Sequence, residues 1–76
     1  MSKIENFKRV FNEVFDENQN ITACGRQKCK ELIAAANAVN DIDVKDDTYY
    51  GDIETGRLKI ENMKSLYNRI NTTHKE

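Results

Sequence analysis

The chain has 76 residues, a formal net charge of −1 at pH 7, and 38% hydrophobic and 33% charged residues. A chain of this length fits one domain, spanning 1–76, whose core only just offsets the entropy of ordering the backbone. The absence of proline and the presence of only three glycines favour helices over an all-β fold. No apolar run could span a bilayer, and the first residues lack the apolar core of a secretory signal. We therefore expect a cytoplasmic protein without a membrane span.

The first predicted helix covers about 3–17. Ser2 is a good N-cap, and Glu5 three residues later completes a capping-box pattern. One face of this segment is apolar, with side chains within an arc of about 140°. These side chains are Ile4, Phe7, Val10, Phe11, Val14 and Phe15. We expect this face to be buried, because its phenylalanines outweigh the weak charge pairs of the other face.

The second predicted helix covers about 21–39, with Asn20 or Thr22 as its N-cap. Its apolar residues spread over about 180°, so we expect it to contact both other helices. They are Cys24, Cys29, Leu32, Ile33, Ala35, Ala36 and Val39. Gly25 permits a close approach, whereas Lys28 conflicts with the apolar arc. Either the long lysine stem reaches solvent or the helix begins elsewhere.

The third predicted helix covers about 57–71, with Thr55 as its expected cap. Its apolar face consists of Ile60, Met63, Leu66, Tyr67 and Ile70. Leu58 lies off this face, so the residues before it should form a turn or extended entry in which Gly56 supplies an unusual backbone angle. The tail 72–76 lacks an apolar anchor and should fray.

The bridge, residues 41–54, is the most unusual part of the sequence. It contains six acidic residues, one lysine, and the adjacent Tyr49 and Tyr50. Its apolar residues do not recur at helical spacing, so we expect a loop, with a possible short β-hairpin to 57–59. The expected fold is therefore all-α: a small three-helix bundle with a long acidic connection between its second and third helices.

The bridge is also the preferred candidate for a binding site. Tyrosine offers a large contact area at low entropic cost, and clustered carboxylates steer a basic partner. The candidate partner-binding residues are Asp43, Asp46, Asp47, Tyr49, Tyr50 and Asp52. An evenly weighted structural alternative has one tyrosine covering the core while the acidic residues pair with Arg57, Lys59, Lys64 or Arg69.

The sequence carries little equipment for catalysis or metal binding. An EF-hand beginning at Asp41 would have the wrong residues at its turn and final ligand positions. Cys24 and Cys29 lack zinc-site spacing and, on one helix, would lie beyond disulfide reach, while His74 lies in the polar tail. We expect no enzymatic activity, no cofactor and no metal.

Two other partner classes remain open besides a protein with a basic surface. The first is nucleic acid, bound by a dimer: residues 22–40 and 55–76 carry excess basic charge, although the whole chain does not. The candidate residues are Arg26, Lys30, Arg57, Lys64 and Arg69. The second is a homo-oligomer assembled through the first and third helices. The abundance of Asn, Lys and Ile is typical of AT-rich genomes and suits a phage or bacterial accessory protein that regulates or inhibits a host system.

Overall fold

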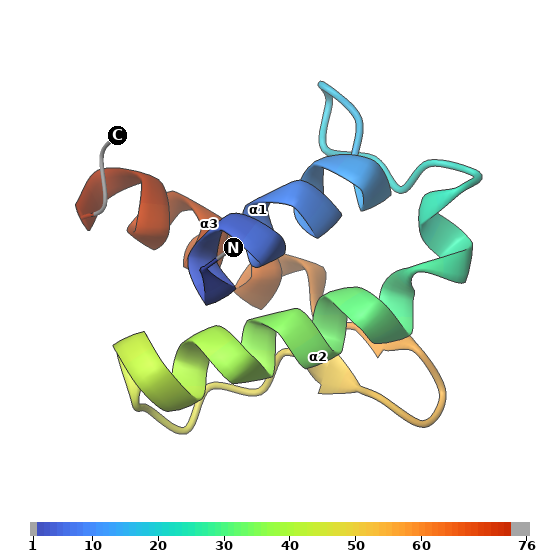
Figure 1. Cartoon of the computed structure of the whole chain (residues 1–76). Helices are drawn as coiled ribbons and strands as arrows, with labels where there is room; N and C mark the ends of the chain where they lie inside the picture. The colour runs from blue at the N-terminus through green and yellow to red at the C-terminus, as the bar shows by residue number, and fades with distance from the viewer. Residues whose placement is uncertain (1, 74–76) are drawn as a thin grey trace.

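The computed structural model describes residues 2–73, apart from the side chains of Asp43 and Thr73. This part of the chain is mostly helical, with three α-helices and one two-stranded antiparallel hairpin (Figure 1). In chain order the elements are α1 (Lys3–Val14), the 3-10 turn η1 (Gly25–Gln27), α2 (Cys29–Val39), the π-helical turn η2 (Asn40–Val44), β1 (Gly51–Asp52), β2 (Arg57–Leu58) and α3 (Ile60–Thr73). The expectation of a small, mostly helical protein is confirmed.

Helix α1 begins as the sequence predicts but ends earlier. The Ser2 hydroxyl accepts a hydrogen bond from the Glu5 amide at 3.1 Å, so Ser2 is the N-cap. The predicted end near residue 17 is wrong, because Phe15 is extended and forms an isolated antiparallel bridge with Ile21. The Asp16 carboxylate holds the intervening turn by accepting hydrogen bonds from nearby amides. This turn returns the chain along the end of α1.

Helix α2 begins at Cys29, later than the predicted position near residue 21. Thr22 is not its N-cap, but its hydroxyl accepts from the Gly25 amide at 2.8 Å and donates to the Glu13 carbonyl at 3.0 Å, which ties the start of η1 to the end of α1. A Cβ on Gly25 would lie 2.7 Å from the Val14 Cα, which real side chains do not tolerate. The late start therefore follows from a tertiary contact between Gly25 and the end of α1.

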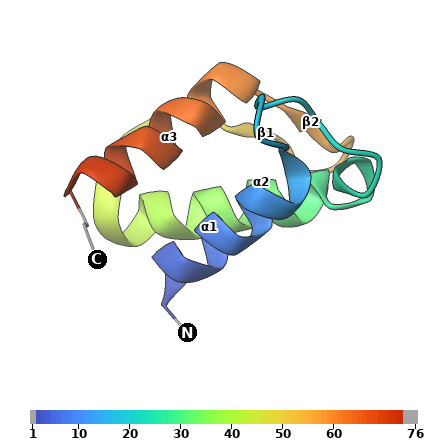
Figure 2. The ribbon, with the colours of Figure 1, turned by 90° about the horizontal axis from the view of Figure 1, so that it is seen from above.

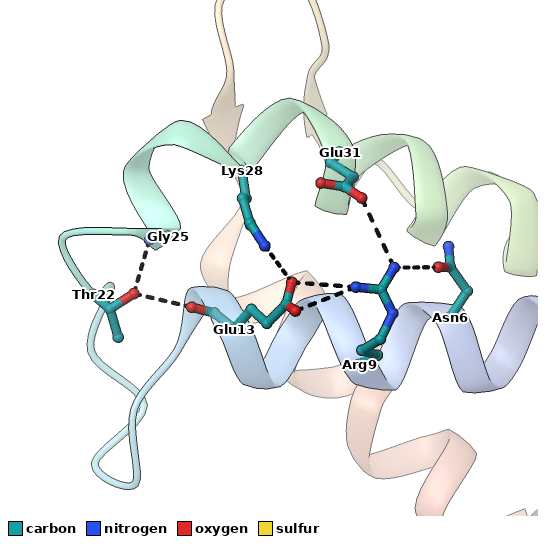
Figure 3. A network of polar contacts seen from close by, with 7 residues as sticks. All are labelled: Asn6, Arg9, Glu13, Thr22, Gly25, Lys28 and Glu31. Carbon is teal, nitrogen blue, oxygen red and sulfur yellow. Dashed lines mark hydrogen bonds and ion pairs between the residues drawn. The ribbon is translucent and has the colours of Figure 1, made fainter.

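Helices α1 and α2 run antiparallel and are joined by a polar network (Figures 1 and 3). The Lys28 ammonium lies 2.7 Å from the Glu13 carboxylate, and the Arg9 guanidinium lies 3.2 Å from that carboxylate and 3.9 Å from Glu31. Lys28 precedes α2, and its ammonium reaches Glu13 at the surface. This geometry removes the conflict that the sequence placed at Lys28.

The core lies between the three helices and the hairpin. Tyr67 of α3 stacks on Phe11 of α1 with ring centroids 4.2 Å apart, which joins the last helix to the first. The buried side chains are Phe7, Val10, Phe11, Val14, Phe15, Leu32, Ile33, Ala35, Ala36, Val39, Tyr50, Met63, Leu66 and Ile70. The predicted apolar faces of the three helices supply all of these except Tyr50, which comes from the bridge.

The bridge is partly helical, contrary to the expectation of a loop. The chain continues from α2 through η2 and reverses at Lys45, whose φ of 56° is left-handed. The possible hairpin is present, with Gly51 opposite Leu58 and Asp52 opposite Arg57. Gly56 has the unusual backbone angle expected of it, with φ 73°.

The hairpin lies at the end of the molecule where α2 begins, and η2 lies at the other end of α2 (Figures 1 and 2). Ile33 packs against Gly51, and the Lys30 stem lies beside Gly56. Helix α3 begins at Ile60 instead of near residue 57, because Arg57 and Leu58 are in β2. Thr55, the expected cap, is consequently in the hairpin turn. Residues 72 and 73 extend α3, and the remaining predicted tail, 74–76, lies outside the described residues.

Candidate interaction surface

The two adjacent tyrosines of the bridge have different environments. The Tyr49 side chain is 53% exposed, whereas Tyr50 is 2% exposed and belongs to the core. Burial raises the pKa of the Tyr50 hydroxyl. Tyr50 is therefore not available as a contact residue, and the structural alternative, in which one tyrosine covers the core, describes it correctly.

The acidic candidates are also divided. Asp46 is tied into the fold: it accepts from the Thr48 amide at 2.9 Å and pairs with Arg69 of α3 at 3.2 Å. Hydrogen bonds from Thr48 and the nearby Arg69 guanidinium lower the pKa of Asp46. The Asn40 side chain also bonds both the amide and the carbonyl of Asp46. Asp46 therefore fixes the start of the extended segment against η2 and α3.

The remaining acidic candidates differ in accessibility. Asp52 is half-buried and accepts from the Glu54 amide at 3.0 Å, which stabilises the hairpin turn. Asp47 is exposed and forms no ion pair with a residue that the structure describes. The backbone of Asp43 lies in η2, and its side chain is outside the described part. Asp47 and Tyr49 are thus the predicted contact residues most accessible to a partner.

Tyr49 is held next to the first turn of α3. Its carbonyl accepts from the Asn62 side chain at 2.6 Å, and the Lys59 ammonium lies 6.0 Å from the centroid of its ring. The Tyr50 carbonyl accepts from the Lys59 amide at 2.9 Å, which continues the hairpin ladder. These contacts fix the backbone on both sides of the Tyr49 side chain.

A hollow of about 460 Å³ opens at the junction of β2 and α3 and is lined by Leu58, Lys59, Ile60, Glu61 and Asn62. Two of these lining residues, Lys59 and Asn62, are the ones that contact Tyr49. We call Tyr49 together with these five residues the Tyr49 surface. It combines an exposed aromatic ring, two aliphatic side chains and charged groups of both signs.

The exposed apolar side chains identify part of this surface that sequence reasoning missed. The large apolar residues exposed in the described chain are Ile42, Tyr49, Ile53 and Ile60. All lie between residues 42 and 60. Ile60 was expected in the core because it fits the helical period, but it is the first residue of α3 and is 38% exposed. The out-of-period Leu58, which indicated a late helix start, was the signal that could have suggested this.

The basic candidates for nucleic-acid binding form two groups. The contact between Lys30 and Gly56 brings the neighbouring Arg57 close to the start of α2, where Arg26 also lies. Lys64 and Arg69 instead lie on α3, and Arg69 pairs with Asp46. The five residues therefore do not form one continuous basic stripe.

The two cysteines do not form a reactive or metal-binding site within the described residues. Cys24 is exposed and Cys29 half-buried, and both are free. The Cys29 thiol lies 3.3 Å from the Gly25 carbonyl, and burial raises its pKa, which disfavours the reactive thiolate. In the described chain, no three of the His, Cys, Asp and Glu side chains come together as metal ligands would. His74 lies outside that part.

A search for membrane-crossing helices finds none of sufficient length and apolarity among residues 2–73. Comparison with protein-family models, with curated proteins and with solved structures finds no match for this chain.

Proposed function

We propose that this protein is a small regulator that binds another protein through the Tyr49 surface. The observation that carries the proposal is the location of the exposed apolar side chains. Ile60, 38% exposed, lines the hollow, and Tyr49, 53% exposed, contacts two of its lining residues, while the apolar faces of the three helices are mostly in the core. Exposed apolar side chains rimmed by polar groups are typical of protein interaction sites, and tyrosine is enriched there. The composition supports a phage or bacterial accessory protein that modulates a host system in the cytoplasm.

Charge supports a partner with a basic contact surface. Residues 41–54 carry six acidic residues and one lysine, and of the acidic side chains that the structure describes in this range only Asp46 is in an ion pair. Such unpaired charge accelerates encounter with a protein of opposite charge more than it adds affinity. The expected partner therefore approaches the bridge with lysine or arginine side chains.

Site-specific photocrosslinking in cells of the native host tests the proposal. A photoreactive phenylalanine analogue replaces Tyr49 in one variant and Lys3, the exposed first residue of α1, in the matched control. We expect one protein to be crosslinked from position 49 and not from position 3. Its capture should fall when Ile60→Ser is added to the position 49 variant, because that substitution removes apolar surface beside the hollow. Equal crosslinking from both positions, or none from position 49, would contradict the assigned surface.

A second candidate function is nucleic-acid binding at the start of α2. The supporting observation is that Arg26, Lys30 and Arg57 are exposed and form no ion pair within the described chain, and that the Lys30 stem lies beside Gly56 of the hairpin turn. Phosphate binding by these residues would weaken steeply with added salt. Gel shifts at low salt with wild type and with the triple glutamine variant of these residues test this candidate. Absence of binding by the wild type would remove it.

A further inference from the structure

We propose that the Tyr49 surface recognises an extended peptide segment of its partner, in which one large apolar side chain enters the hollow and a flanking arginine or lysine approaches the acidic bridge. This inference rests on the proposed function and specifies the partner's chemistry.

The size of the hollow favours a side chain over a whole helix face. Its volume of about 460 Å³ is at the small end of the range for small-molecule pockets, about 300–1,000 Å³. Five consecutive residues, Leu58 to Asn62, line it, so it spans only the junction of β2 and the first turn of α3. Helix-in-groove recognition needs anchors spaced over several turns, which this hollow does not accommodate.

The surface is formed before any partner arrives. The bond from Asn62 to the Tyr49 carbonyl, at 2.6 Å, joins the bridge to α3, and the bond from the Lys59 amide to the Tyr50 carbonyl, at 2.9 Å, joins it to the residue before α3. The buried Tyr50 ring anchors the same segment in the core. A prearranged surface loses little entropy on binding, so burial of a single apolar side chain of the partner can give a measurable affinity.

The charge around the hollow selects a basic segment. Residues 41–61 contain seven acidic and three basic residues, and the Arg69 pairing neutralises only Asp46. Asp47 and Glu61 are exposed and form no ion pair with any residue of 2–73. The nearby Lys59 ammonium lies towards the face of the Tyr49 ring. An acidic peptide would therefore be repelled by the net charge, whereas a basic one would be attracted.

Titration of the ¹⁵N-labelled full chain with synthetic peptides, followed by NMR, tests the inference. The probe is an arginine-rich peptide with one central phenylalanine. One control replaces that phenylalanine with serine, and another replaces the arginines with glutamates. We expect the probe to shift the amide signals of Tyr49 and of residues 59–62. The serine control should bind about tenfold more weakly or worse, since burying a phenylalanine is worth at least one such factor. The glutamate control should also bind more weakly, because the acidic bridge repels its charge.

Matched protein variants show whether the hollow is responsible. Ile42 has the same exposed fraction as Tyr49, 53%, but lies in η2 at the other end of α2. Ile60→Ser, which changes a residue lining the hollow, and Tyr49→Ser should each reduce the preference for phenylalanine, and Ile42→Ser should leave it unchanged.

Three results would overturn the inference. The first is that the probe and the serine control bind equally well. The second is that the probe shifts amide signals only on other surfaces. The third is that, without peptide, the amide signals of the Tyr49 surface shift with protein concentration. The last result would make a second copy of the chain the occupant. Crosslinking of a partner from position 49 combined with any of these results would leave the proposed function standing and refute only the peptide chemistry. Absence of that crosslinking would refute the proposed function itself.

Discussion

At the scale of single residues, burial separates side chains that the sequence presents as equivalent. Tyr49 and Tyr50 have the same chemistry and adjacent positions, yet one is 53% exposed and the other 2%. A pattern without helical or strand periodicity does not say which of two neighbours points inward. The structure assigns the core contribution to Tyr50 and leaves Tyr49 as the contact residue of the proposed interface.

Alanine substitution of the two tyrosines should separate stability from binding. Tyr50→Ala leaves a cavity in the core and should lower the free energy of unfolding by about 3 kcal/mol or more. Tyr49→Ala removes an exposed ring and should change it by less than about 0.5 kcal/mol, while reducing crosslinking of the partner from other positions of the surface. Urea unfolding followed by circular dichroism measures both values. Similar losses of stability for the two variants would contradict this assignment.

Gly25 is a residue at which one added methyl group should destabilise the fold. An added Cβ would lie 2.7 Å from the Val14 Cα and 2.9 Å from the Thr22 hydroxyl, and would also meet the Val14 carbonyl. Gly25→Ala should therefore cost about 1–3 kcal/mol, more than alanine gains by restricting the unfolded chain. The exposed neighbour Ala23 provides the control, because Ala23→Ser should be nearly neutral. Thermal unfolding of both variants checks the difference.

At the scale of elements, the sequence predicts those features that depend only on residues close together in the chain. The Ser2 cap, the apolar face of α1 and the left-handed Gly56 depend on residues close in the chain, and the structure has all three. The start of α2 depends instead on the contact of Gly25 with α1. The end of α1 depends on the isolated antiparallel β-bridge between Phe15 and Ile21. Contacts between segments distant in sequence leave no periodic signal, so these boundaries were missed.

The ion pair between Glu13 of α1 and Lys28, the residue before α2, has an effect that can be measured at one side chain. A hydrogen bond from Lys28 lowers the pKa of the Glu13 carboxyl below its ordinary value of 4.5. Because the folded pKa is lowered, the stabilisation is fully present above the unfolded pKa and is lost as pH falls through the folded pKa. Lys28→Met should therefore raise the pKa of Glu13, measured by carboxyl ¹³C NMR.

The matched control for this titration is Lys30→Met. Lys30 is exposed and forms no ion pair with the described residues. Its substitution should leave the pKa of Glu13 close to the wild-type value, since distant charges at the surface are screened. A comparable rise in both variants would show that the general positive charge of the region, and not the Lys28 contact, lowers the pKa.

At the scale of the whole molecule, the three helices and the hairpin close over one core and leave little apolar surface outside. The Cα radius of gyration is 11.3 Å, close to the roughly 11 Å expected of a compact chain of this length. The bridge contributes to this closure through Tyr50 and Asp46. The sequence left open whether the bridge is a contact surface or gives one tyrosine to the core, and the structure divides it into residues that complete the fold and residues that face solvent.

This closure predicts a monomer in the absence of a partner. The exposed large apolar residues of the described chain are few, and the acidic bridge of one copy would repel that of another in a symmetric contact. Obligate dimers bury far larger and more apolar surfaces. Sedimentation velocity across a wide concentration range should therefore give a mass near 8.8 kDa throughout. A mass that rises with concentration, and returns to the monomer value in Tyr49→Ser but not in Ile42→Ser, would instead make self-association the use of the Tyr49 surface.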